Sequence, residues 1–180
     1  GHEYTAPSED SSLIYEAWRR RVNSPRSTAV GRLFDAAAAL TGVCTTASFE
    51  GQGPMELEAL CDKPGNNIDL TLEKVDNLLI TNWDPLLPVM LDSALTVSER
   101  ASMFHASLAH AMLQQARAIR EQHGARAISF SGGVFQNRVL TEHALALLSE
   151  DGFKVHLPGL IPVNDAGISF GQVIEYGFNR

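Results

Sequence analysis

The chain has 180 residues, of which 44% are hydrophobic and 19% are charged, and this composition fits one ordinary globular domain. Its formal net charge of −7 gives no broad basic surface, so we do not expect nucleic acid as a principal ligand. Cys44 and Cys61 are too far apart to form a metal-binding pair, and no apolar run reaches the roughly 20 residues that cross a bilayer. We therefore expect a cytoplasmic protein without membrane contact.

Polar residues fill positions 1–10, which we expect to be a disordered lead-in to a single lobe at 11–180. The sequence begins at Gly1 instead of methionine, which suggests a piece of a longer protein. Further along, apolar residues at helical spacing predict a series of helices. These cover 11–22, 29–42, a segment entered at Pro54 after a turn through Gly51 and Gly53, and 96–124, with a Ser98 cap and an end at Gly124.

Alternating apolar and polar residues predict strands between these helices and after them. A pair of strands is expected around 68–72 and 78–80, followed by a proline-interrupted connection that contains a short helix. From residue 126 onward the order becomes strand, helix, strand, helix, at 127–130, 135–150, 153–157 and about 164–178. Strands that alternate with helices predict an α/β fold with a parallel sheet covered by helices.

A glycine-rich bend, Ser131-Gly132-Gly133, falls where the strand at 127–130 ends and the next helix begins. Ligands of α/β sheets bind beyond the carboxyl ends of strands, and glycines let backbone N–H groups approach a phosphate. The positive end of a helix beginning near Phe135, with the amides of Gln136 and Asn137, would favour the same anion. The alternative is a simple tight reversal of the chain, because neither common phosphate-loop motif is present.

A second polar loop, PVNDAGISFGQ at 162–172, also follows a strand and opens a helix. Asn164 and Asp165 stand at the start of that helix, where a helix cap alone would explain them. Two neighbouring strand ends with glycine-rich turns and one carboxylate instead suggest a phosphate site with a divalent metal ligand.

Four motifs follow one another along the chain: SPRSTAVGRLFDAAAALTG, SFEGQGPMELEAL, SFSGGVFQNRVLTE and GFKVHLPGLIPVNDAGISFGQ. Together they resemble the C-terminal lobe of the Kae1-like domain in the HypF carbamoyltransferase family of nickel–iron hydrogenase maturation. The likeness covers nearly all of residues 11–178. The tRNA threonylcarbamoyl-transferring and nodulation-type O-carbamoyltransferase families share the Ser-Gly-Gly-Val element, but the Phe-Gln-Asn continuation and the Glu-Gly-Gln turn favour HypF.

The resemblance implies an actin-like, hexokinase-like ATPase lobe of the ASKHA class. Such a lobe has a parallel or mixed sheet flanked by helices, a helical insert, and a nucleotide held between two lobes. The residues implied to contact ATP or a carbamoyl-adenylate are Asp35, Gln52, Glu56, Gly132, Gly133 and Asn137, and the residue implied to bind a divalent metal is Asp165. From the residues alone, Asp35 could equally face water, and Glu56 and Glu58 could serve the dipole at the start of their own helix.

One departure from the family pattern is large. HypF pairs the aspartate of this lobe with histidines of a His-rich motif on the N-terminal lobe, and this sequence has no such motif. His105 and His110 are five residues apart on a helix, so they point to different sides and cannot replace it. The acylphosphatase-like, zinc-containing and YrdC-like portions of the family are also missing. We therefore expect one lobe of a larger protein, which alone binds nucleotide weakly and does not turn over.

The resemblance further implies transfer of a carbamoyl group from a carbamoyl-adenylate to the C-terminal cysteine of a HypE-like acceptor protein. No nucleophile is then needed in this lobe, and Ser131 is not expected to act as a hydrolase serine because G-x-S-x-G is absent. Two alternatives stay open: an O-carbamoyltransferase or tRNA threonylcarbamoyl-transferase relative, and a non-catalytic interaction module. His105, Cys44 and Cys61 are expected to be packing residues.

Overall fold

Helix α5 (Val97–His123) is the longest element of the computed structural model, which describes residues 11–61 and 65–179. Its N-terminal cap is Thr96, because the Thr96 hydroxyl accepts the N–H of Glu99 and the Glu99 carboxylate accepts the N–H of Thr96. The prediction of a Ser98 cap is therefore wrong. The predicted end is confirmed, since Gly124 adopts a left-handed φ of 70° directly after the helix. The predicted lead-in at 1–10 lies outside the described residues.

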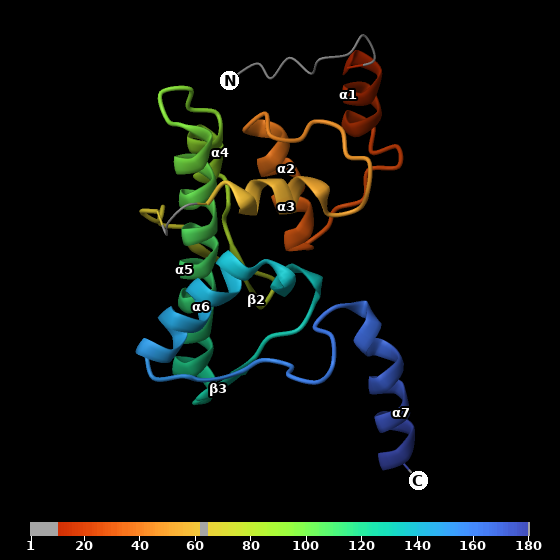
Figure 1. Cartoon of the computed structure of the whole chain (residues 1–180), viewed down its shortest axis with the longest axis vertical. Coiled ribbons are helices and arrows are strands. Elements are labelled where there is room, and N and C mark those ends of the chain that lie inside the picture. Colours follow the sequence, from red (N-terminus) through yellow and green to blue (C-terminus); the bar gives the residue numbers. More distant parts are fainter. Residues whose placement is uncertain (1–10, 62–64, 180) are drawn as a thin grey trace.

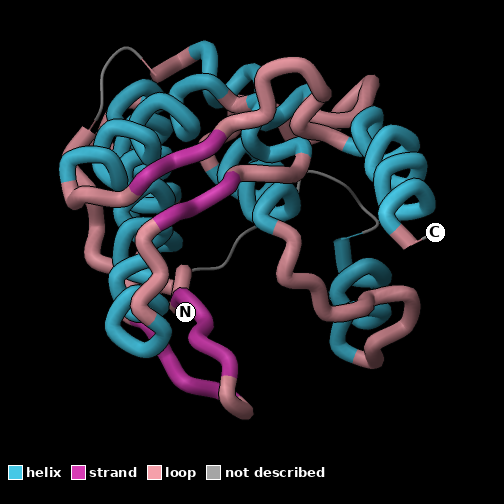
Figure 2. The backbone as a smooth tube through the Cα atoms, turned by 90° about the horizontal axis from the view of Figure 1, so that it is seen from below, coloured by secondary structure: helices cyan, strands magenta, loops and turns pink. Residues whose placement is uncertain are grey.

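Helix α6 (Arg138–Glu150) packs along α5 (Figure 1). One short strand precedes α6 in the sequence and another follows it, and these two strands pair in parallel (Figure 2). Strand β3 (Ala127–Ser129) pairs with β4 (Lys154–His156). This confirms the predicted strand–helix–strand order. At the far end of α6, Asp151 accepts hydrogen bonds from Arg117 and Arg120 of α5, which fixes the two helices together. The core between these elements contains Phe104, Leu108, Phe130, Leu140, Ala144, Leu148 and Phe153.

Helices α2 (Val30–Leu40) and α3 (Gln52–Ala59) pack against each other and contribute to the same core. The predicted turn at Gly53 and helix entry at Pro54 are wrong, because α3 already begins at Gln52. Gly51, with a φ of 83°, makes the turn before the helix. Gly53 instead lies inside α3, where a Cβ would be 3.0 Å from the Cβ of Ala38. This glycine therefore permits the close approach of two helices.

Strands β1 (Leu72–Val75) and β2 (Leu78–Thr81) form an antiparallel hairpin. Its two-residue turn, Asp76-Asn77, has positive φ angles of 48° and 69°, as type I′ turns require. The predicted strand at 68–72 is thus placed too early, because the segment before Leu72 packs on α5 instead of pairing with a strand. Leu70 is buried there, and the N–H of Ile68 donates to the hydroxyl of Ser107. The short helix α4 (Leu86–Met90) follows as predicted.

Two helices lie at the edge of the molecule, and Figure 1 and Figure 2 show both on the same side of it. They are α1 (Ser11–Arg19) and α7 (Ile168–Phe178), and α7 has no buried residue. Both helices expose large apolar side chains, namely Leu13, Ile14, Tyr15 and Trp18 on α1 and Ile168, Phe170, Val173, Ile174, Tyr176 and Phe178 on α7. Within the described ranges no helix is long and apolar enough to span a membrane.

The contact between α2 and α3 predicts a position-specific effect of enlarging Gly53. We expect Gly53→Val to lower the free energy of unfolding by about 1–3 kcal/mol, because the new side chain must push Ala38 away. Gly31→Val is the matched control, since a Cβ at Gly31 in α2 meets nothing within 4 Å and carries the same helix-propensity change. Denaturant unfolding of the two variants measures the difference, and equal stability would contradict the packing described here.

Candidate functional site

The two predicted loops meet in the folded chain. The N–H of Gly132 donates to the carbonyl of Val163 over 2.7 Å, and a Cβ at Gly133 would lie 3.9 Å from the Cβ of Asn164. Gly132 has a φ of 109°, a conformation that side-chain-bearing residues rarely adopt, so the bend requires glycine there. The structure therefore brings Ser131-Gly132-Gly133 and the Asn164-Asp165 loop together, as expected for a single site at one edge of the parallel strands.

Asn164 and Asp165 differ in what their side chains do. The side-chain Oδ1 of Asn164 accepts the N–H of Ala166 and caps the short turn η2 (Asp165–Gly167), so the capping interpretation is confirmed for this residue. Asp165 is the exposed first residue of that turn. The described ranges contain no cluster of three or more His, Cys, Asp or Glu side chains that could hold a metal ion. This lobe therefore offers Asp165 as a single carboxylate, which does not make a complete metal site.

The side chain of Asn137 is buried and used inside the protein. Its Oδ1 accepts the N–H of Leu140 over 2.8 Å and caps α6, while its Nδ2 lies 2.9 Å from Nε2 of His105 on α5. Both polar atoms of the Asn137 amide thus have partners inside the protein. The predicted contact of Asn137 with a nucleotide stays a prediction. Through His105, Asn137 fixes the start of α6 to the central helix.

His105 is a satisfied buried histidine, as predicted. Because the Asn137 amide donates to Nε2, the ring proton lies on Nδ1, which is 2.8 Å from the carbonyl oxygen of Ala101. Cys61 Sγ lies 3.2 Å from the same Nδ1. Burial lowers the pKa of His105, opposed by the Ala101 hydrogen bond and the charge of Glu58. A neutral ring with its Nδ1 already protonated cannot take the proton of Cys61, so these residues do not form a nucleophile and its base.

Glu58 has a role that the sequence did not indicate. Helix α3 begins at Gln52, so Glu58 lies near its C-terminal end and cannot serve the dipole at its start. Its Oε1 instead accepts the N–H groups of Arg138 over 2.7 Å and Val139 over 3.4 Å. The interpretation of Glu58 as a first-turn carboxylate of its own helix is therefore wrong: it caps α6, whose sequence lies far along the chain. Local spacing gives no signal for such a contact.

The three remaining predicted residues lie on the α2–α3 pair, and α2 also contacts the turn η1 (Gly133–Gln136) that follows the glycine bend. Gln52 Nε2 donates to the carboxylate of Glu56 over 2.8 Å, and Gln52 Oε1 accepts the N–H of Ser48. Asp35 forms an ion pair with Arg32 over 2.9 Å, which fits a partly solvent-facing carboxylate. These three residues, predicted to contact the nucleotide, thus occupy one helix pair beside the bend, and in the described structure Asp35 forms no direct hydrogen bond with the other two.

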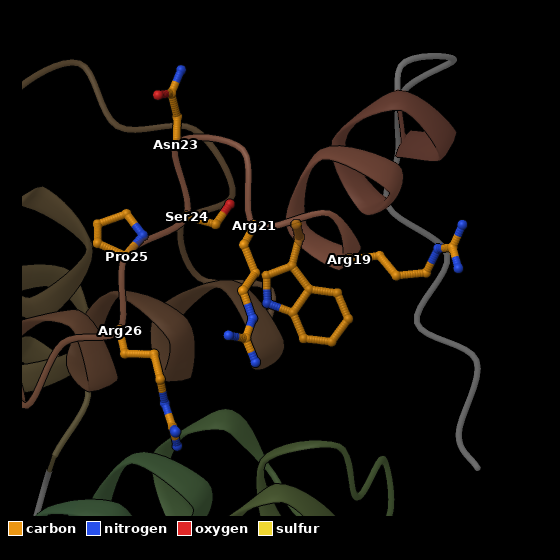
Figure 3. A pocket seen from close by; sticks show the side chains of 7 residues that line it. Arg19, Arg21, Asn23, Ser24, Pro25 and Arg26 are labelled. Carbon is orange, nitrogen blue, oxygen red and sulfur yellow. The ribbon is translucent and has the colours of Figure 1, made fainter.

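A cavity of about 760 Å³ lies elsewhere. The single segment 18–26 lines it, and none of the predicted site residues takes part. Figure 3 shows Arg21 and Arg26 extending in a similar direction, while Arg19 extends away from them. Arg19 is held by Glu16 over 3.0 Å. Four arginines lie between 19 and 26, so positive charge is concentrated in this segment although the net charge of the chain is negative.

Comparison with known proteins decides the family. The model of the family "Carbamoyltransferase, Kae1-like Domain, second subdomain" matches residues 2–172, which is nearly the whole chain. The chain belongs to the HypF carbamoyltransferase family. Its sequence is 34% identical over 173 residues to carbamoyltransferase HypF of Rhodobacter capsulatus, a match that covers 93% of this chain and 22% of that protein. The HypF of Synechocystis is 31% identical over 169 residues, covering 89% of this chain and 21% of the relative.

Solved HypF structures have the same fold. Full-length HypF in its phosphate- and nucleotide-bound form superposes with a TM-score of 0.85 at 31% identity, covering 94% of this chain and 23% of that one. HypF of T. kodakarensis gives a TM-score of 0.77 at 22% identity, covering 92% of this chain and 22% of that one. The predicted α/β lobe of the ASKHA class is therefore confirmed. The chain spans less than a quarter of the length of these relatives.

Buried His105 and partly buried His143 predict a loss of stability in mild acid. Burial lowers the pKa of His105, and burial together with the charge of nearby His110 lowers the pKa of His143. Below the usual histidine pKa of about 6.5, the unfolded chain therefore binds more protons than the folded chain. We expect the free energy of unfolding to fall as the pH is lowered from about 7.5 to about 5.5.

Denaturant titrations across this pH range measure the effect. His105→Gln should reduce the slope of stability against pH, whereas His123→Ala, which removes an exposed histidine at the end of α5, should leave most of it. A slope that His105→Gln does not change would show that the ring titrates equally in the folded and unfolded chain.

Proposed function

We propose that the chain is the nucleotide-binding lobe of a carbamoyltransferase, which holds ATP or a carbamoyl-adenylate at the Gly132-Gly133 bend. The observation that carries this proposal is the contact between the bend and the Asp165 loop at one edge of the parallel strands. Membership of the HypF family and the fold shared with a nucleotide-bound HypF structure support it.

In this reaction the carbamoyl group passes from the adenylate to the C-terminal cysteine of a HypE-like acceptor. The acceptor cysteine reacts as its thiolate after its thiol proton is lost to water: a carbon–sulfur bond forms, the bond between the carbamoyl carbon and the phosphate oxygen breaks, and AMP leaves with the electron pair. The nucleophile comes from the acceptor, so this lobe needs to supply none. The lobe contributes binding and orientation, with Asp35 and Glu56 toward the ribose or base, Gln52 beside the nucleotide and the bend toward the phosphates.

A divalent metal would be bound by Asp165 together with ligands from another part of the protein. Asp165 alone supplies one oxygen-bearing side chain, whereas divalent cations need several ligands. Such an ion would neutralise phosphate charge. This arrangement would explain why the loop that contacts the proposed anion-binding bend carries an aspartate.

The exposed apolar faces of α1 and α7 are proposed to pack against the first subdomain of the Kae1-like domain. The family description of this region as a second subdomain implies such a partner. Several large apolar side chains exposed on one helix are uncommon on the surface of a soluble monomer and indicate an interface with another part of the protein. The YrdC-like domain and the HypE-like acceptor are further proposed partners.

The nucleotide proposal predicts specific losses of affinity. Asp35→Ala and Glu56→Ala should each weaken adenine-nucleotide binding by about tenfold, since each removes a charged hydrogen-bond acceptor from the α2–α3 pair. The measurement is a calorimetric titration of the chain produced together with its first subdomain. Glu121→Ala, an exposed carboxylate on α5, is the matched control. Unchanged affinity in both site variants would refute the assignment.

The proposed interface predicts that charge on α7 disrupts assembly. Val173→Asp should strongly reduce co-purification of a tagged first subdomain that is produced together with the chain, because Val173 is 69% exposed here and would be covered in the complex. Gln172→Asp introduces the same charge at the neighbouring exposed position and should have a smaller effect. Equal recovery of the subdomain with Val173→Asp and the unaltered chain would exclude α7 from the interface.

The acceptor distinguishes the remaining alternatives. A carbamoyltransferase of the proposed kind modifies a cysteine-tailed peptide, whereas a tRNA-modifying relative modifies an adenosine of tRNA. A non-catalytic interaction module transfers nothing to either acceptor when the rest of the protein is present. Family membership favours the first outcome.

A further inference from the structure

The carboxylate of Glu58 joins two parts of the molecule that are distant in sequence. It projects from α3 and accepts the N–H groups of Arg138 over 2.7 Å and Val139 over 3.4 Å. These are the first two amides of α6, where the helix dipole is positive and where helices commonly bind phosphate. The protein therefore places its own negative charge at the N-terminus of α6, so this helix end is not available to a ligand anion.

The first turn of α6 controls the position of the glycine bend. The Thr141 hydroxyl in that turn donates to the carbonyl of Phe135 over 3.0 Å, and the N–H of Phe135 donates to the carbonyl of Gly132 over 3.1 Å. The Asn137 cap and its contact with His105 hold the same turn from the side of α5. A shift of the start of α6 would therefore move Gly132 and Gly133 with it.

Glu58 lies on the same helix, α3, as Gln52 and Glu56. These two side chains are hydrogen-bonded to each other on α3, and Gly53 holds α3 closely against α2 and Ala38. One carboxylate thus connects the helix pair proposed for the ribose or base to the turn that supports the phosphate bend.

We propose that Glu58 is a positioning residue, which sets the distance between the base-binding and phosphate-binding halves of the nucleotide site. The ligand in this inference rests on the proposed function, while the mechanical part rests on the hydrogen bonds of Glu58 alone. A nucleotide that bridges the two halves requires them in register. Adenosine or inorganic phosphate occupies only one half, so neither depends on the distance between them.

The expected result is a loss of affinity for ADP, which bridges the two halves, without a similar loss for adenosine or inorganic phosphate. In the chain produced together with its first subdomain, Glu58→Ala should weaken ADP binding by about tenfold and leave the affinities for adenosine and inorganic phosphate within about twofold. Glu58→Gln keeps an acceptor oxygen and should restore most of the ADP affinity. Glu142→Ala, an exposed carboxylate on α6, is the matched control.

Three results would overturn the inference. Equal losses for all three ligands would indicate general destabilisation, and unchanged ADP affinity would show that the two halves stay aligned without Glu58. A gain in phosphate affinity in Glu58→Ala would show that the N-terminus of α6 is itself the anion site once its carboxylate is removed.

Amide hydrogen exchange of the 180-residue chain tests the mechanical part without any ligand. Glu58→Ala should accelerate exchange at Gly132, whose N–H is bonded to Val163, and at Arg138 and Val139, while Ala109 in the middle of α5 exchanges as before. Unchanged exchange at Gly132 would refute the positioning role whatever the nucleotide does. If the unaltered protein binds no adenine nucleotide, the proposed function fails, and accelerated exchange would still support the link between Glu58 and the bend.

Discussion

The candidate site depends on how the backbone donors at the start of α6 are satisfied. Leu140 donates its buried N–H to Asn137, and Arg138 and Val139 donate theirs to Glu58. A buried donor without an acceptor, as the Leu140 N–H would be without Asn137, costs about 1–3 kcal/mol, which is a large part of the stability of a single domain. These two side chains, from different parts of the chain, therefore determine where α6 begins, and with it where the preceding glycine bend stands.

This constraint has a chemical consequence for anion binding. A carboxylate already lies at the positive end of α6, and a phosphate placed beside it would meet a like charge. The exposed bend at Gly132 and Gly133 and the neighbouring Asp165 loop remain as the surface on which a nucleotide and a metal ion would meet. Such an exposed surface agrees with the proposal that another lobe supplies the other half of the site, as do the exposed apolar side chains of α1 and α7.

Local signals predicted the order of elements well and the contacts between them poorly. The long helix before Gly124, the strand–helix–strand unit around α6 and the glycine bend follow from apolar spacing and from glycines at positive φ. Thr96 was missed as a cap although Glu99 follows it at capping-box spacing. The sequence predicts a turn at Gly53, because it cannot distinguish a glycine that bends the chain from one that lets a neighbouring helix pack closely.

The sequence by itself determined the order of helices and strands, the glycine bend at 131–133, the end of α5 at Gly124 and, through four motifs, the HypF family. These depend on spacing along the chain and on the conformations open to each residue type, which are local properties. Only the tertiary structure decided that Asn137 bonds to His105, that Glu58 caps α6 instead of its own helix, and that the Gly132 and Val163 backbones meet. Each of those contacts joins segments far apart in sequence, and their partners are chosen by how the helices pack, for which no local pattern exists.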